Sequence, residues 1–291
     1  MVWMFIQAII NGLFAGGVYA LVAVGITIVY GVMKMVNFAM GDYLTWGMYA
    51  TYIGYCIFGW NCYALIPFVM VFMAILGFVS FKLCIKPLLG RDGTAFIMVT
   101  VGLSYFLMNL AQLIFTANSL TVPSDIKSSS FALGTFFVGM PRLIAFLVAV
   151  VLVLGINYLL NKTTVGRAMR ATSENVEVAE MLGINTKRSF ALAFTMSVIL
   201  AGLAGLLLTP IYFVTPSAGA IFKTTALMIV VLGGLGDIKG AFVGGLLVGI
   251  MEQLVATLVD AQLGPAGIFL VFLVVLYLRP QGLFGKGARV A

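Results

Sequence analysis

Residues 163–184, TTVGRAMRATSENVEVAEMLGI, form the only long polar segment in an otherwise apolar sequence. The segment is helical in pattern, and it mixes charged with apolar residues as a docking surface does. Glu177 and Glu180 stand three residues apart and therefore share one face of a helix. Gly166 permits a bend into the segment, and Gly183 suits a left-handed helix C-cap. The pattern predicts one or two short amphipathic helices outside a membrane, with a solvated connecting loop as the alternative.

The rest of the chain has the composition of an integral membrane protein. Of its 291 residues, 63% are hydrophobic and 9% are charged, whereas soluble domains carry about 25% charged residues. The apolar runs are long and continuous, unlike the roughly ten-residue alternating strands of a membrane barrel. We therefore expect an all-α, polytopic transmembrane helical bundle, surrounded by lipid, that forms one domain over residues 1–291. The net charge of +7 lies in short loops, so it indicates orientation and not nucleic-acid binding.

The charges between the apolar runs predict eight or nine spans. Basic residues in the loop at 82–94, in the segment 161–189 and at the C-terminus place all three in the cytoplasm by the positive-inside rule. Gly59-Trp60-Asn61 divides the uncharged stretch 43–81 into two spans. Three spans before residue 82 give nine in total and an outer N-terminus. A re-entrant region at 37–42, or a half-helix at 224–235, reduces the total to eight.

A short polar interruption, KMVNFAMGD at 34–42, separates the first two apolar runs. A broken helix here would expose backbone groups that only protein or a water-lined cavity can satisfy, and such breaks often mark transport pathways. Asn37, Phe38, Gly41 and Asp42 are therefore candidates for lining a pathway, with Asn37 favoured. The alternative is a tight cytoplasmic turn in which Asp42 supplies the charge at a helix N-terminus.

Two other charged residues lie in or beside apolar runs. Glu252 stands about three turns into its run and is a functional candidate by default, because ionisable groups are costly in a membrane. We nevertheless expect it to lie close enough to the outer interface to be solvated. Lys223 stands at the rim of a short run and is expected to snorkel toward water.

Glycines spaced four residues apart give the clearest helix-packing pattern in the chain. Gly236, Gly240 and Gly244 follow this spacing, and Gly245 and Gly249 lie beside them. Two adjacent ridges of small residues allow another helix to approach closely. The pattern leaves open whether the partner helix belongs to this chain or to a second subunit.

The absence of histidine limits the chemistry that this chain can perform. It excludes His-based proton relays, Ser-His-Asp catalysis and the usual zinc sites, so we expect no metal site and no catalytic residue. Cys56 and Cys62 lie near the expected outer face, where a disulfide is conceivable. Free cysteines that act as small hydrophobic residues in lipid are the favoured interpretation.

A nucleotide-binding loop of the form G-x-x-x-x-G-K-[ST] is also missing. Lys127, Lys162 and Lys223 precede Ser or Thr, but none of them follows Gly. If ATP drives this protein, a separate hydrolysing subunit must dock on a cytoplasmic surface. The segment at 163–184 is the only cytoplasmic segment long enough to offer such a docking surface.

The same segment resembles the cytoplasmic coupling loop of ABC-importer permeases, and in particular the branched-chain amino-acid type. The resemblance lies in Gly166-Arg167-Ala168-Met169-Arg170-Ala171, followed by Asn175, Ala179, Gly183 and Ile184. NFAMGD at 37–42 and GGLGDIKGA at 233–241 match the same family, so the resemblance runs over nearly the whole chain. Met40 replaces the His that is expected in many relatives, and any role of that His is absent here.

The resemblance implies that 161–189 docks as a coupling segment in a cleft on an ATPase subunit. The docking residues would be Gly166, Arg167, Arg170, Ala171, Glu174, Asn175, Glu177, Ala179 and Gly183. It also implies a homologous second permease, two ATP-binding subunits that carry ATP and Mg, and an extracytoplasmic substrate-binding protein. This chain would be a transport subunit without a cofactor of its own, moving leucine, isoleucine or valine across a bacterial inner membrane, with its C-terminus in the cytoplasm.

Two other functions fit an apolar helical bundle. An ion-coupled secondary transporter would need membrane-embedded acids, and only Asp42 and Glu252 qualify; no convincing inverted repeat is visible. A membrane enzyme without His would need a Ser-Lys or paired-Asp site, and no Asp pair falls at membrane depth. Both alternatives rank below the importer subunit.

Overall fold

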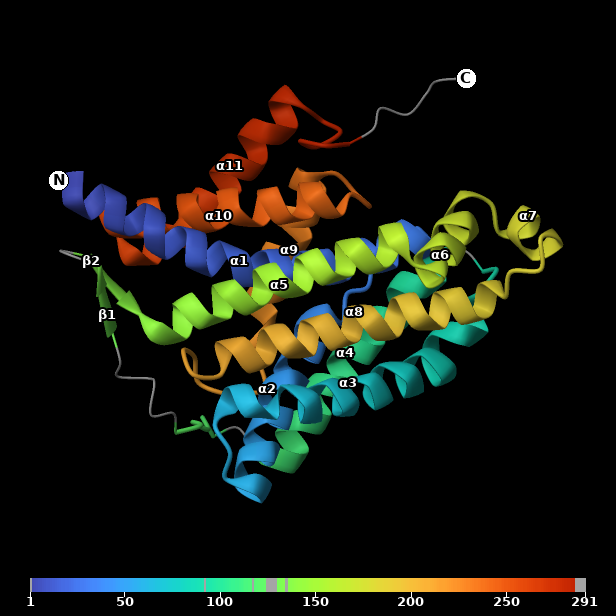
Figure 1. Ribbon diagram of the computed structural model, residues 1–291, viewed down its shortest axis with the longest axis horizontal. Helices are drawn as coiled ribbons and strands as arrows, with labels where there is room; N and C mark the ends of the chain where they lie inside the picture. Colours follow the sequence, from blue (N-terminus) through green and yellow to red (C-terminus); the bar gives the residue numbers. More distant parts are fainter. Residues whose placement is uncertain (1, 92, 117, 124–129, 134–135, 286–291) are drawn as a thin grey trace.

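The computed structural model describes residues 2–91, 93–116, 118–123, 130–133 and 136–285. Within these ranges the chain is almost wholly helical (Figure 1). The main helices are α1 (Val2–Met33), α2 (Met40–Phe58), α3 (Ile66–Ser80), α4 (Gly93–Phe115), α5 (Met140–Lys162), α6 (Thr164–Glu174), α7 (Val176–Met181), α8 (Thr186–Leu208), α9 (Gly219–Gly233), α10 (Ile238–Leu258) and α11 (Gly264–Leu278). Short 3-10 or π segments flank α3 and precede α11: η1 (Cys62–Leu65), η2 (Phe81–Ile85), η3 (Lys86–Leu88) and η4 (Ala261–Leu263).

A short hairpin is the exception to the helical architecture. Strands β1 (Ser130–Leu133) and β2 (Phe136–Gly139) pair antiparallel, with Ser130 opposite Gly139. The hairpin lies in the connection between α4 and α5, and the rest of the described chain keeps the expected all-α architecture. Because the strands are four residues each, they carry too little periodicity to be recognised from sequence.

Seven helical segments in the described part of the chain are long and apolar enough to cross a membrane. They are Trp3–Met33, Cys62–Leu88, Gly93–Phe115, Met140–Lys162, Thr186–Leu208, Ile238–Leu258 and Ala261–Leu278. Helix α9 is shorter, with 15 residues, and α2 contains Asp42 and several tyrosines. The predicted break after Phe58 is confirmed, because Gly59 ends α2 in the left-handed conformation (φ 66°).

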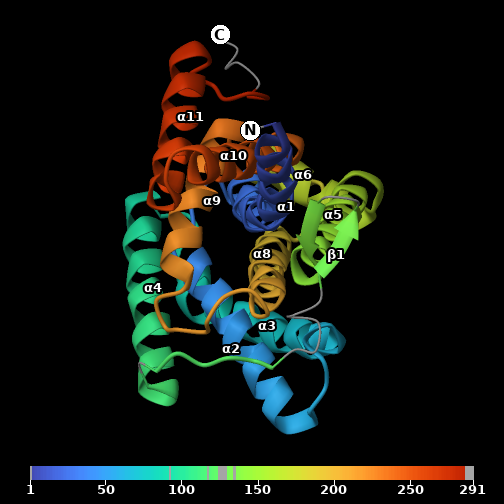
Figure 2. The same cartoon turned by 90° about the vertical axis from the view of Figure 1, so that its left-hand side faces the viewer.

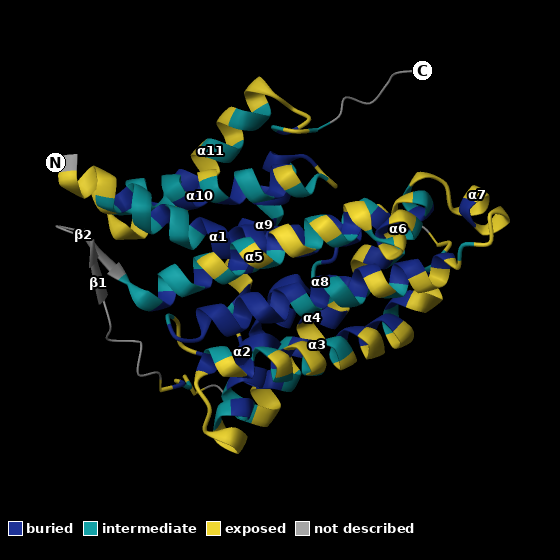
Figure 3. Ribbon diagram, in the orientation of Figure 1, coloured by how far each residue is buried: buried dark blue, intermediate teal, exposed yellow. Residues whose placement is uncertain are grey.

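Helices α1 and α8 form the centre of the bundle. Most of the spanning part of each is buried, whereas only a minor share of α5 and of α11 is buried (Figure 3). Helix α1 packs against α10, α8, α5 and α9, and α8 packs against α2 and α3. The end view in Figure 2 shows α10 and α11 on one side of this centre and α2 and α3 on the other. Helices α6 and α7 lie at the opposite end of the bundle from the N-terminus and the hairpin (Figure 1).

Small residues bring α1 and α10 into close contact. A Cβ added at Gly245 would lie 2.6 Å from the Ala20 Cβ, and one at Gly16 would lie 2.7 Å from the Gly245 carbonyl oxygen. A Cβ at Gly249 would likewise overlap the backbone of Gly12 and Gly16. Real Cβ atoms essentially never come within 3.0 Å of such atoms, so only glycine permits this spacing. These two positions of the predicted ridge therefore pack inside the chain.

The remaining glycines of the predicted ridge lie against α9 or outside the helix. A Cβ at Gly240 would overlap the Gly233 carbonyl, and one at Gly244 would lie 3.2 Å from the Leu232 side chain. Gly236 is not on α10: it lies in the preceding turn with φ 91°, and an added Cβ would be 3.6 Å from the Gly31 Cα. Its assignment to the helix ridge is corrected, because Asp237 caps the helix and begins the helical spacing after Gly236.

At the end that carries the N-terminus, backbone bonds join two connecting segments. The Leu120 N–H donates to the Val214 carbonyl at 3.0 Å, and the Val214 N–H donates back to Leu120 at 2.9 Å. This bridge ties the segment after α4 to the segment between α8 and α9.

Cys56, Cys62 and Cys84 are free, as expected.

Candidate coupling segment and translocation pathway

Polar caps divide the 163–184 segment into α6 and α7. The Thr163 hydroxyl accepts a hydrogen bond from the Gly166 N–H at 3.2 Å, and the Asn175 side chain accepts one from the Val178 N–H at 3.1 Å. Such bonds satisfy the free N–H groups at a helix start. Gly183 has φ 80°, a conformation that favours glycine. The prediction of one or two short helices here is confirmed in its two-helix form.

Gly166 does not make the bend that the sequence suggested. It lies inside α6, and the chain turns at Thr163, whose backbone is extended. A Cβ at Gly166 would overlap the Leu160 backbone. The glycine is needed because α6 folds back tightly against the end of α5, and not because of its own backbone freedom.

One face of α6 is buried against the bundle. Met169 is 1% exposed and belongs to the hydrophobic core, and Thr172 is equally buried. The Arg170 guanidinium donates to the Asn161 side chain at 2.8 Å, which links α6 to the end of α5. Helix α6 contacts α1, α5 and α8. A displacement of α6 would therefore be transmitted directly to three helices of the bundle.

The other face of this segment is exposed and carries both charge and apolar groups. Arg167, Glu174 and Glu177 are exposed, as are Met181 (84%) and Leu182 (74%). Two adjacent apolar side chains in water, surrounded by charges, are typical of a site for a protein partner. The surface defined by these five residues is called the α6–α7 patch below.

Three predicted docking residues do not face outward. Gly166 is buried against the end of α5. Ala179 is 1% exposed, and it packs toward the bundle because α7 turns its small residue inward. Ala171 is half-buried. Arg170, as described, is engaged with Asn161. The exposed members of the predicted set are Arg167, Arg170, Glu174, Asn175, Glu177 and Gly183.

The first pathway candidate, Asn37, stabilises a turn. It is fully buried, and its side-chain oxygen accepts from the Ala39 N–H at 2.9 Å. Its amide nitrogen donates to the Met40 sulfur at 3.5 Å. Asn37 therefore uses its polar atoms to shape the entry into α2, with Phe38 half-buried beside it.

The second candidate, Asp42, belongs to a polar cluster that joins three helices. Its carboxylate accepts a hydrogen bond from the Ser104 hydroxyl of α4. The Lys223 ammonium of α9 lies 3.1 Å from the Ser104 oxygen and 3.9 Å from Asp42 Oδ2. This is the one ion pair found among the described residues. The expectation that Lys223 snorkels to water is wrong, because its ammonium finds a mostly buried carboxylate within the protein.

The starts of α2 and α9 lie against each other inside the bundle. A Cβ at either Gly41 or Gly219 would overlap the backbone of the other glycine. The Gly219 N–H donates to the Thr45 hydroxyl at 2.9 Å. Helix α9 thus begins four residues before Lys223 and beside α2. Two helices that begin inside a bundle have the geometry of interrupted helices at transport sites.

Sequence reasoning missed Ser104, Thr45 and Lys223 as members of this cluster. The available signal was a basic residue in an apolar run together with an acid, Asp42, in another. The expectation that Glu252 is solvated also needs correction. The residue is half-buried, and its Oε2 atom is buried without a hydrogen-bond partner among the described residues.

Comparison with known proteins identifies the family. The model of the family described as "Branched-chain amino acid transport system / permease component" matches residues 8–278. The chain belongs to this permease family. It is therefore a membrane component of a transport system, not an enzyme, and works with partner subunits.

Individual relatives match over almost their full length. The chain is 28% identical to the high-affinity branched-chain amino acid transport system permease protein BraD of Pseudomonas aeruginosa, covering 98% of this chain and 97% of BraD. It is 30% identical to the corresponding LivH protein of Escherichia coli strain K12, covering 97% and 96%. The solved structure of PsaBC from Streptococcus pneumoniae in complex with Fab is similar in fold, with a TM-score of 0.51, 14% identity and 98% of each chain covered.

Proposed function

We propose that this chain is a membrane-spanning permease subunit of an ATP-driven importer of branched-chain amino acids. The family match across residues 8–278 carries the proposal. Near-full-length relatives named for high-affinity branched-chain amino acid transport support the substrate class. An ion-coupled secondary transporter is the alternative, and the family match favours the importer.

The proposed topology has nine crossings of a bacterial inner membrane by one permease domain, residues 1–291. The seven long apolar segments account for seven crossings, and α2 and α9 would supply the other two. The N-terminus and the α6–α7 end lie at opposite ends of the bundle (Figure 1). This agrees with an odd number of crossings, α1 to α5, between them. The Phe284 N–H donates to the Gly233 carbonyl at 3.1 Å, which ties the C-terminal segment to the end of α9. Gly236, three residues after Gly233, borders the same cavity as Arg170 of α6 and Lys34. The C-terminal end of the described chain is thus near the α6 end, which the positive-inside rule assigns to the cytoplasm.

The 161–189 segment is proposed to be the coupling segment. The α6–α7 patch would dock in a cleft on one of two ATP-binding subunits, which hold the ATP and Mg²⁺. Because Met169 is buried in the bundle and α6 contacts α1, α5 and α8, closure of the ATPase pair would move these helices as a rigid body. The substrate would reach the outer face on a substrate-binding protein.

The proposed pathway passes the cluster of Asp42, Ser104 and Lys223. Charged groups at membrane depth are costly and are retained where they serve transport. The Lys223 side chain keeps 27% of its surface exposed, and a homologous second permease would complete the pathway on that open side. Gly41 and Gly219 allow α2 and α9 to meet at the cluster.

The first test is purification of the chain from its membranes in mild detergent. We expect ATPase subunits to co-purify and to be released by Arg167→Glu, because Arg167 is exposed on the α6–α7 patch. Arg279→Glu is the matched control, since Arg279 is an exposed cation outside the patch. Reconstituted complexes should take up leucine, isoleucine and valine only with ATP. A chain that purifies alone and moves these solutes in ATP-free liposomes would refute the importer assignment.

A further inference from the structure

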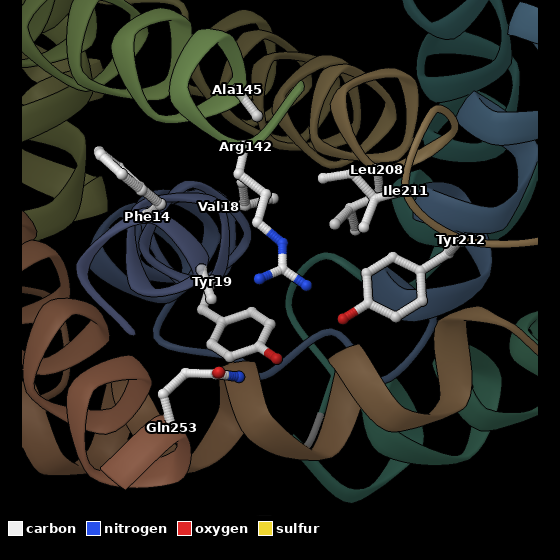
Figure 4. Close-up of a pocket in the computed structure, with 10 residues that line it drawn as sticks. Phe14, Val18, Tyr19, Arg142, Ala145, Leu208, Ile211, Tyr212 and Gln253 are labelled. Atoms are coloured by element: carbon white, nitrogen blue, oxygen red, sulfur yellow. The ribbon is translucent and has the colours of Figure 1, made fainter. Parts of the chain in front are cut away.

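A small cavity opens among α1, α5, α10 and the segment after α8, away from the α6–α7 end. Its volume is about 30 Å³, the space of about one water molecule. Figure 4 shows the guanidinium of Arg142 pointing between the rings of Tyr19 and Tyr212, with the amide of Gln253 beside the Tyr19 hydroxyl. Polar groups from four parts of the chain therefore converge on one point.

Arg142 is a cation in an unfavourable position. It lies in the first turn of α5, where the helix dipole repels positive charge. It is half-buried and forms no ion pair among the described residues. A guanidinium held there is well placed to receive an anion, and its planar donors match a carboxylate in a bidentate manner.

A carboxylate without a cation lies on the far side of Tyr19. The Tyr19 hydroxyl interacts with both the Glu252 carboxylate and the Tyr212 hydroxyl. Glu252 Oε2 is buried without a hydrogen-bond partner, and Glu252 forms no ion pair in the described part of the chain. An unpaired buried carboxylate oxygen costs free energy unless a ligand or water satisfies it.

The remainder of the cavity wall is apolar. Phe14, Val18, Ala145, Leu208 and Ile211 line it. The cavity thus combines a guanidinium that has no ion-pair partner among the described residues, two phenol hydroxyls and a largely aliphatic wall, and the Glu252 carboxylate lies next to Tyr19. These are the groups that bind the carboxylate, the ammonium and the side chain of an aliphatic amino acid.

We propose that this cavity is the closed form of an outer binding site for an aliphatic α-amino acid. Arg142 binds the substrate carboxylate, the Tyr19 hydroxyl accepts a hydrogen bond from the ammonium while the Glu252 carboxylate lies behind it, and the apolar wall holds the branched side chain. The inference rests on the proposed importer function and adds the residues that accept the substrate from its binding protein.

The position of the lining residues explains how the site can open. Arg142 follows the β1–β2 hairpin, and Tyr212 lies in the segment that the Leu120–Val214 bridge joins to the end of α4. A binding protein that docks on these outer segments would widen the cavity. The Phe222 ring packs against the rings of Tyr19 at 5.9 Å and Tyr212 at 5.5 Å.

The test uses the complete complex in proteoliposomes with its leucine-loaded binding protein. Arg142→Gln and Glu252→Gln should each raise the KM for the loaded binding protein, or lower uptake, by about tenfold or more, because a charge-assisted bond is lost. Arg279→Gln is the control and should leave uptake unchanged, because Arg279 is an exposed cation outside the cavity. Arg142→Lys should recover part of the loss, since it restores the charge but not the bidentate geometry. Tyr212→Phe, which keeps the ring, serves as the mild variant if the charge variants fail to assemble, and it should weaken uptake with normal assembly.

A photoreactive diazirine analogue of leucine gives a second readout. In the wild-type complex it should label peptides that contain Val18, Leu208 or Ile211, and excess leucine should prevent the labelling. Arg142→Gln or Tyr212→Phe should reduce it. If the wild-type complex imports leucine but labelling maps elsewhere and the variants transport normally, the site is refuted and the importer function stands. If the wild-type complex imports no aliphatic amino acid, the proposed function itself fails.

Discussion

The ammonium of Lys223 lies 3.9 Å from Asp42 Oδ2 and joins the short helix α9 to the start of α2. Ser104 bridges the two groups from α4. Charges at this depth must be compensated, so each partner determines the free-energy cost of the other. The pair therefore holds together the two helices that begin inside the bundle.

Removal of one partner should destabilise the protein more than removal of both. Because 27% of the Lys223 side chain is exposed, we expect the lower end of the usual cost for Lys223→Met, about 3 kcal/mol of unfolding free energy. Asp42→Asn combined with Lys223→Met should recover part of that loss. Thermal unfolding in detergent measures both effects, with Lys239→Met as the control, since Lys239 is exposed. A single variant as stable as wild type would show that the pair contributes nothing.

Glycine substitutions should have opposite signs on the two kinds of helix surface. Gly249→Ala places a Cβ against the backbone of Gly12 and Gly16, so we expect overpacking to cost about 1–3 kcal/mol. Gly155, within α5, has open space around the position of a Cβ. Gly155→Ala should leave stability unchanged or raise it by up to about 1 kcal/mol through helix propensity. Equal shifts in melting temperature for the two variants would contradict the close α1–α10 contact.

The local features of this fold were accessible from the sequence, and the long-range ones were not. Gly59 ends α2 where the apolar run is interrupted, because a break in hydrophobic pattern and a left-handed cap both act over a few residues. The Asp42–Lys223 pair depends on which helices meet across 181 residues of sequence, and composition contains no such information. Gly166 shows the same limit: its value lies in a contact with Leu160 made by the fold-back of α6.

In the candidate site, too, the local features were predictable from the sequence and the long-range contacts were not. The helical pattern and mixed charge of 163–184 predicted α6 and α7, because amphipathic spacing is a local property. Which face of α7 is buried follows from tertiary packing, so Ala179 was assigned outward although it is 1% exposed. Arg142 drew no attention in the sequence, since a basic residue near a helix end is unremarkable until Tyr19 and Tyr212 surround it.

The exposed and buried apolar residues of the coupling segment should separate docking from folding. Met181 is 84% and Leu182 74% exposed, so Met181→Ser with Leu182→Ser should leave the melting temperature of the isolated subunit unchanged. If an ATPase subunit covers both side chains, their loss should weaken its binding by at least about tenfold, since burying each contributes about 1.5–3 kcal/mol. Met169→Ala, by contrast, opens a cavity in the core and should destabilise the subunit itself by about 2–5 kcal/mol. Co-purification yield and thermal unfolding, measured on both variants, distinguish the two effects. An undiminished ATPase yield from the Met181/Leu182 double variant would move the docking surface away from α7 and leave Arg167 and Glu174 of α6 as the remaining contacts.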